Sequence, residues 1–361
     1  MSSGREGVVR WALRAGLVAG GAVATTMVGR RMVRRSGPGN PEDVPLGSLH
    51  TTPISVLTED GVTLCVEVAD ADRDDPDAPT VVFLPGFCLN MDAWHFQRLD
   101  LAGAVRCVFY DQRGHGRSGR GARANATIEQ FARDLHAVLE ATVPTGPVVL
   151  VGHSLGGMVV MAYAQAHPEE FGARVVGAAL IATSAGRLAE MTLGLPAAVV
   201  RGLWPFSPGV VGVVTNRPML IKRGIGADRD VGLWVTRRLS FGARDVPPDV
   251  VRFAGAILNT TPLDVFGELF PEFDRHDKEA ALPVFRGCPT LILAGSKDVL
   301  TPADHSRGMA VQVPEAEFTV LDGAGHLLML ECPTEVNAAL RRLLERARLA
   351  GGRRPSRRAA G

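Results

Sequence analysis

The chain has 361 residues, of which 46% are hydrophobic and 21% are charged. This length and composition predict a globular protein with one large core and a smaller appended domain, and they exclude a fibrous or disordered chain. The net charge of +1 hides an uneven layout, because residues 1–35 and residues 346–361 each carry +6 and the residues between them carry −11. Only three of the 39 basic residues are lysines, which indicates a general bias toward arginine and not a nucleic-acid partner.

The first 40 residues predict an N-terminal arm and linker, separate from the folded body. Residues 15–29 are uncharged and mostly small or apolar, with Arg14 before them and Arg30 after them. This run is shorter than the roughly 20 residues that span a bilayer. A membrane anchor, a signal peptide cleaved near residues 22–24 and a helix packed on the body are the three interpretations. We favour membrane contact through residues 8–35, so the expected localisation is membrane-associated or cytoplasmic.

The folded body begins with a β-hairpin at residues 55–58 and 62–68, with Asp60-Gly61 as its turn. Thr127, followed by Gln130 three residues later, predicts a capping box at the start of a helix. Buried runs that alternate with helices predict an α/β protein with a mostly parallel central sheet covered by helices on both faces. The short apolar runs after the hairpin are 81–84, 107–110, 148–151, 176–181, 291–293 and 318–321.

Residues 187–285 interrupt this alternation and predict an inserted helical cap. Thr261-Pro262 marks a helix start within it. We expect the cap to lie over the carboxyl edge of the sheet, where open α/β sheets bind ligands, with one or two of its aromatic residues lining the pocket. The core then comprises residues 50–186 and 286–346, and residues 347–361 form a basic tail. The cap contains the aromatic residues Trp204, Phe206, Trp234, Phe241, Phe253, Phe266, Phe270 and Phe273, among others.

A Gly-x-Ser-x-Gly motif stands between a predicted strand and a predicted helix, with Ser154 at its centre. A serine hydroxyl is a poor nucleophile, so it has to be held on a tight turn beside a base and near N–H groups that stabilise an anion. Gly152 and Gly156 remove side chains that would clash in such a turn. The motif makes Ser154 a candidate nucleophile.

An acid and a histidine follow later in the chain, Asp298 and His326, each in a loop after a predicted strand. Alone, either would be an ordinary surface or structural residue. In the order Ser, Asp, His they predict a catalytic triad in which His326 is the general base and Asp298 orients it.

The oxyanion hole is expected from two backbone N–H groups, those of Phe87 and Leu155. Leu155 directly follows the candidate nucleophile, and Phe87 stands in a loop after an early strand. Cys88 lies beside this loop. It lacks the tight, glycine-flanked turn that surrounds Ser154, which is called a nucleophile elbow, so we interpret Cys88 as a packing residue. The five cysteines are scattered and form no metal-binding or disulfide pattern, so we expect no metal site: Cys65, Cys88, Cys107, Cys288 and Cys332.

Together these motifs make residues 53–346 resemble the α/β-hydrolase superfamily, in its serine esterase and lipase-like branch with a helical cap. The resemblance implies the α/β-hydrolase fold and a structural role for His115. It departs from the family at Pro85, where many relatives carry histidine. Serine at the elbow excludes epoxide hydrolases and haloalkane dehalogenases, which need aspartate there. The matching motifs are residues 84–87, residues 111–118, the elbow and Gly325-His326.

The expected activity is hydrolysis of a carboxylic ester, with an apolar, lipid-like acyl substrate, through an acyl-enzyme and without a metal or organic cofactor. The apolar cap and the N-terminal arm motivate the lipid-like substrate. Three alternatives use the same triad: an acyltransferase, a perhydrolase or haloperoxidase-like enzyme, and a C–C bond hydrolase. A ligand-binding protein with a vestigial triad is the alternative from another class, and the intact set of site residues argues against it. The oligomeric state is left open.

Overall fold

The computed structural model describes residues 44–73, 75, 77–186, 188, 229–243 and 245–352. The predicted N-terminal arm, the first part of the predicted cap and the end of the basic tail lie outside these residues. The membrane contact expected of residues 8–35 therefore stays a prediction. Across the described ranges, no helix combines the length and apolar character needed to cross a bilayer.

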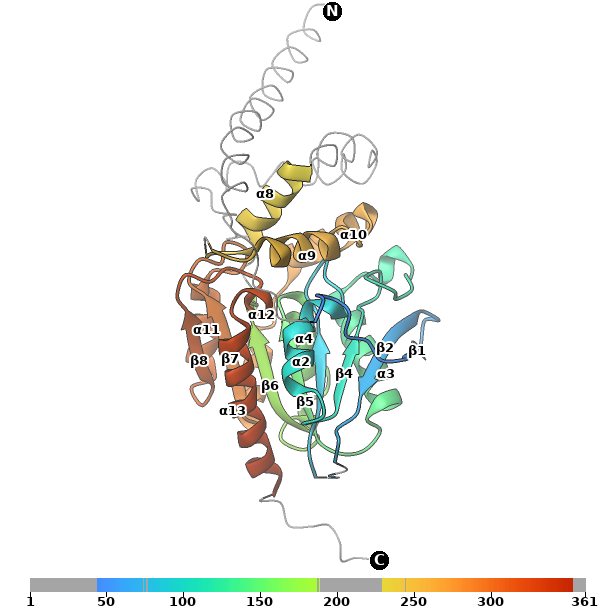
Figure 1. The fold of residues 1–361 in the computed structure, drawn as a ribbon. Coiled ribbons are helices and arrows are strands. Elements are labelled where there is room, and N and C mark those ends of the chain that lie inside the picture. Colours follow the sequence, from blue (N-terminus) through green and yellow to red (C-terminus); the bar gives the residue numbers. More distant parts are fainter. Residues whose placement is uncertain are drawn as a thin grey trace, which may run out of the picture.

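An eight-stranded sheet forms the centre of the molecule (Figure 1). The first two strands form the predicted hairpin, β2 pairs antiparallel with β4, and the remaining neighbours are parallel. The predicted strands and the mostly parallel sheet are thus confirmed. In spatial order the strands are β1 (Pro53–Leu57), β2 (Thr63–Ala69), β4 (Cys107–Tyr110), β3 (Thr80–Leu84), β5 (Val148–His153), β6 (Val175–Ile181), β7 (Thr290–Gly295) and β8 (Glu317–Leu321).

The described helices alternate with the parallel strands, as the sequence predicts. The α-helices are α2 (His95–Leu101), α3 (Ile128–Thr142), α4 (Leu155–Ala166), α8 (Arg229–Ser240), α9 (Pro248–Leu258), α10 (Leu263–Arg275), α11 (Ala303–Gln312), α12 (Leu328–Glu331) and α13 (Pro333–Gly352). The 3₁₀ helices are η1 (Met91–Trp94), η2 (Arg123–Asn125), η3 (Pro168–Glu170) and η6 (Glu279–Gly287).

The two faces of the sheet pack into separate cores, because side chains alternate along each strand. In β3, Val82 and Leu84 enter the first core and Val81 and Phe83 enter the second. Helices α3 and α4 complete the first core, whereas α2, α12 and α13 complete the second. The stripe that α13 turns to the second core continues to Ala347 and comprises Val336, Ala339, Leu340, Leu343 and Ala347.

Helix α3 begins at the predicted residue, but only half of the predicted capping box forms. The Thr127 hydroxyl accepts a hydrogen bond from the backbone N–H of Gln130 at 3.2 Å. The Gln130 side chain does not reach back to Thr127, because its amide donates to the buried Asp134 carboxylate and accepts from Arg133. The prediction of a complete capping box was wrong, because Asp134 and Arg133 bind the Gln130 side chain, which therefore does not bind the Thr127 backbone.

Helices α8 to α10 stand between β6 and β7 in the chain and lie across one end of the sheet (Figure 1). Helix α10 begins at Leu263, directly after the predicted start. Arg120, in the loop after β4, forms ion pairs with Asp264 and Glu268 of this helix. In the same loop, a Cβ on Gly114 would lie only 3.2 Å from the Val265 side chain. Helix α10 is therefore anchored on the loop that follows β4.

Candidate active site

The turn between β5 and α4 holds Ser154 in an unusual backbone conformation, with φ 51° and ψ −117°. A positive φ is strained for a residue with a side chain, and it persists only where the surrounding structure enforces it. The Ser154 N–H donates to the Ile181 carbonyl at 2.9 Å, and the Ser154 carbonyl accepts from the Thr183 hydroxyl at 2.7 Å. Strands β5 and β6 thereby enforce the tight turn that the sequence predicts.

The glycines on either side of Ser154 are required by close backbone contacts. A Cβ on Gly152 would lie 2.5 Å from the Gly156 carbonyl oxygen, and a Cβ on Gly156 would overlap the Leu84 carbonyl oxygen. Separations this short do not occur for real Cβ atoms. The expected steric reason for both glycines is therefore present in the structure.

Asp298 and His326, far apart in the sequence, meet above the carboxyl ends of β7 and β8. The His326 Nδ1 lies 2.8 Å from the Asp298 Oδ2, and both side chains are buried. A carboxylate can only accept, so Nδ1 carries the proton and Nε2 presents its lone pair. Burial alone would raise the pKa of Asp298, but His326, through its hydrogen bond and through its charge when protonated, and the bonds from Thr301 hold this pKa below its usual value.

The backbone of His326 is fixed by two further contacts. Its N–H donates to the Ser240 carbonyl at 2.9 Å, at the end of α8. Its carbonyl accepts from the Nε2–H of His153, the residue before Ser154, at 2.9 Å. Burial and the neighbouring His326 lower the pKa of His153 to about 3, so this imidazole stays neutral. The structure thus connects the Ser154 turn with the His326 loop through His153, a residue that the sequence analysis did not select.

The two predicted oxyanion residues border the same turn. Gly86, directly before Phe87, packs so closely that a Cβ there would lie 3.1 Å from the Ser154 Cβ. Leu155 is the first residue of α4, where backbone N–H groups have no partner within the helix. Within the described part of the chain, neither the Phe87 nor the Leu155 N–H has a protein acceptor. Both groups are available to an anion beside Ser154.

Aromatic side chains cover the Phe87 loop. The Phe87 ring lies 5.2 Å, centroid to centroid, from both Phe266 and Phe273 of α10. On another side it meets His115 edge-on at 5.8 Å. Two of the expected aromatic residues therefore reach the loop beside Ser154 and give it an apolar cover.

His115 and Cys88 are two further titratable groups near this loop. Burial lowers the pKa of His115 to about 4, and its Nδ1–H donates to the Arg113 carbonyl at 2.9 Å. Burial raises the pKa of the Cys88 thiol to about 12. Both groups are therefore uncharged near neutral pH, as their assignment to structure and packing requires.

Glu331 is a second residue that the sequence analysis missed. Its carboxylate accepts from the Gly325 N–H at 2.7 Å, from Gly242 at 2.9 Å and from Ala243 at 2.5 Å. Burial raises the pKa of Glu331, although the three N–H groups act in the opposite direction. The carboxylate therefore joins the chain after α8 to the glycine loop that carries His326. Its position five residues after that histidine was the only signal in the sequence.

Comparisons with known proteins agree with this arrangement. Residues 81–339, more than half of the chain, match the model of the alpha/beta hydrolase family, which confirms the predicted superfamily and fold. The putative non-heme bromoperoxidase BpoC of Mycobacterium tuberculosis is 25% identical over 271 residues, which are 72% of this chain and 91% of BpoC.

Solved structures share the fold over nearly their whole length. Est816, described as an N-acyl homoserine lactone degrading enzyme, is 27% identical with a TM-score of 0.61, covering 80% of this chain and 99% of Est816. The esterase RhEst1 from a Rhodococcus species is 22% identical with a TM-score of 0.65, covering 82% and 99%. The chain therefore belongs to the alpha/beta hydrolase family.

Proposed function

We propose that this chain is a serine hydrolase that cleaves carboxylic esters through an acyl-enzyme on Ser154. The observation that carries the proposal is the buried Asp298–His326 hydrogen bond beside a serine with φ 51°. A strained serine turn, an oriented imidazole and two free N–H groups are the parts that acyl transfer needs. The esterases among similar structures support this chemistry.

In the proposed mechanism, His326 Nε2 takes the proton from the Ser154 hydroxyl as the oxygen attacks the ester carbonyl. Asp298 keeps the proton on Nδ1 and stabilises the imidazolium that forms. The N–H groups of Phe87 and Leu155 bind the oxygen of the tetrahedral intermediate. His326 then protonates the leaving alcohol, and a water molecule activated by the same imidazole releases the acid.

The proposed substrate has an apolar, lipid-like acyl group. The aromatic cover that Phe266 and Phe273 make over Phe87 supports this class, because apolar walls with few polar groups bind acyl chains. Est816 degrades an acylated lactone, which is a cyclic ester, and this supports the inclusion of lactones among the substrates to test.

A perhydrolase or haloperoxidase-like activity on the same triad is the second candidate, because BpoC is similar over most of its length. The two activities differ in the acceptor that attacks the acyl-enzyme, water in one case and hydrogen peroxide in the other. Product analysis with hydrogen peroxide at increasing concentration distinguishes them: peracid formation at the expense of free acid supports the second candidate.

The test is turnover of p-nitrophenyl esters of increasing chain length by the full chain and by Ser154→Ala. We expect the variant to lose at least about 1,000-fold in kcat, and the optimum to lie at chains longer than acetyl. Cys88→Ala is the matched control, since it removes a neighbouring nucleophile of raised pKa and should keep most of the activity. Ester turnover that survives in Ser154→Ala contradicts the proposal, and an acetyl preference contradicts the lipid-like substrate.

A further inference from the structure

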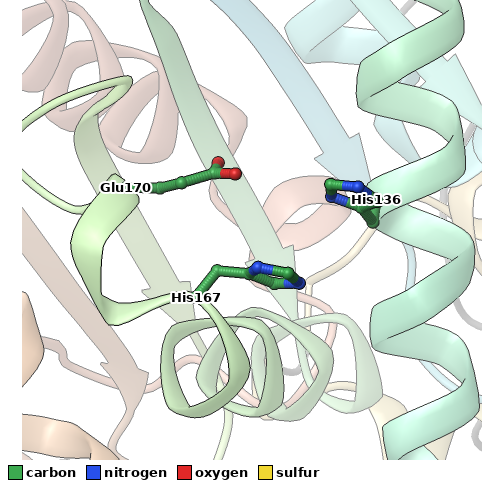
Figure 2. A group of neighbouring side chains, drawn as sticks. All are labelled: His136, His167 and Glu170. Carbon is green, nitrogen blue, oxygen red and sulfur yellow. The ribbon is translucent and has the colours of Figure 1, made fainter.

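A second group of chemically capable side chains lies at the other end of α4. His136 projects from α3, His167 caps the end of α4, and Glu170 ends η3. One donor atom from each lies within 4.8 Å of the others, and Figure 2 shows the three side chains converging on one space. All three are half-buried. They stand 31 and 3 residues apart, a spacing that matches no sequence motif.

Local contacts fix the backbone that carries His167 and Glu170. The His167 N–H donates to the Tyr163 carbonyl at 2.8 Å and closes α4. Pro168 follows at once and starts η3, so the separation of His167 and Glu170 is set by a rigid turn. The imidazoles of His136 and His167 stack at 4.9 Å with planes 8° apart.

We propose that His136, His167 and Glu170 form a binding site for a divalent transition metal, with Zn²⁺ as the first candidate. Two imidazoles and a carboxylate, with an open fourth position, are donors that Zn²⁺ takes, at about 2.0–2.2 Å. Tetrahedral bonds of this length place donor atoms about 3.4 Å apart. The donor atoms now lie within 4.8 Å of one another, so metal binding would require the side chains to rotate until these separations reach that value.

The surroundings of Glu170 support this site and set its strength. The Tyr163 hydroxyl donates to Glu170 Oε2 at 2.7 Å, and outer partners of this kind orient a metal-binding carboxylate. Arg174 Nη1 lies 3.7 Å from Glu170 Oε1 and 2.8 Å from Glu140. Its positive charge opposes a cation at Glu170. The site therefore binds more weakly than it would without Arg174.

The metal would act on stability and not on turnover. Helix α4 begins directly after Ser154 and ends directly before His167, which separates the two by roughly 20 Å along the helix axis. A bound ion would join α3, α4 and η3 and would favour the folded state over the unfolded chain. The inference is independent of the proposed esterase activity.

The test is titration of the metal-free full chain with zinc sulfate, followed by calorimetry and by thermal unfolding. We expect one saturable site, a Tm that rises with zinc, and an unchanged kcat on p-nitrophenyl esters. Cobalt added in place of zinc should give the visible absorption of tetrahedral Co²⁺. Because calorimetry needs no substrate, an inactive protein that still binds zinc would refute the esterase proposal alone.

His136→Gln and His167→Gln should each weaken zinc binding at least tenfold, and Arg174→Gln should tighten it. His50→Gln is the matched control, because His50 also contacts carboxylates, those of Glu67 and Asp92, on another surface. Circular dichroism of the metal-free variants checks their folding. Absence of saturable binding by the wild type, or equal affinity in both histidine variants and the control, would overturn the proposal.

Discussion

The two ends of helix α4 bring chemically active side chains together in different ways. At its start, Ser154 is held by a strained backbone and by glycines without room for a side chain, and the Asp298 carboxylate that bonds His326 has hydrogen bonds on both oxygens. At its end, His136, His167 and Glu170 are half-buried, and their donor atoms lie within 4.8 Å of one another. The first site is therefore built before a ligand arrives, whereas the second would be completed by the ligand.

The largest expected effect of breaking the first site is at Asp298. Asp298→Asn should lower kcat on an ester on the order of 10⁴-fold, because the amide no longer keeps the proton on Nδ1 of His326. Glu170→Gln, the same carboxylate-to-amide change at the other end of α4, should leave kcat within about twofold. Steady-state kinetics of both variants measures this contrast. Equal losses in the two would refute the assigned separation of the two sites.

Because the Ser154 turn is tightly packed, adding a single methyl group to one of its glycines should destabilise the folded protein. Gly156→Ala should reduce the free energy of unfolding by about 3 kcal/mol, because its Cβ overlaps the Leu84 carbonyl. Gly308→Ala in α11 is the control, since a Cβ there meets nothing within 4 Å and alanine favours a helix by up to about 1 kcal/mol. Urea unfolding measures both. A Gly156→Ala protein as stable as the wild type would show that the turn adjusts.

The neutral His153 predicts a specific dependence of stability on pH. Its folded pKa of about 3 lies below the ordinary 6.5, so the unfolded chain binds its proton first and stability falls as pH drops from 6.5 toward 3. Between pH 6 and pH 4.5, the titration of His153 should lower the free energy of unfolding by about 2 kcal/mol. Urea unfolding of His153→Gln at several pH values should show a shallower fall. Other buried histidines titrate in the wild type and in His153→Gln alike. If the free energy of unfolding fell equally steeply with pH in both proteins, the assignment of a neutral His153 would be contradicted.

The smallest of these effects is expected at Glu331, which acts through the His326 loop and not on the substrate. In the wild type, the N–H groups of Gly242 and Gly325 bind different oxygens of the Glu331 carboxylate. In Glu331→Gln only one oxygen remains to accept these hydrogen bonds. We expect kcat to fall about tenfold with little change in KM, while Glu331→Asp restores part of it. Glu335→Gln, on the exposed start of α13, is the control. A change confined to KM would instead assign Glu331 to substrate binding.

Local patterns in the sequence were sufficient for the elements of the fold and for the order of the site motifs. Apolar runs between glycines and prolines predicted the strands, since a strand covered on both faces has to be apolar throughout. The hairpin turn at Asp60-Gly61 formed as expected. The N-cap at Thr127 was also found, but its partner Gln130 was drawn to side chains whose positions depend on the folded core.

By itself, the sequence determined the α/β class, the mostly parallel sheet, the family and the positions of a serine, an aspartate and a histidine after the strands β5, β7 and β8. Short-range rules suffice there, because turn geometry and strand burial leave their marks on neighbouring residues. Only the tertiary structure decided that His153 and Glu331 hold the His326 loop, and that His136 meets Glu170. Those contacts join segments whose approach depends on how helices pack over the sheet, and packing of distant segments leaves no periodic pattern in the chain.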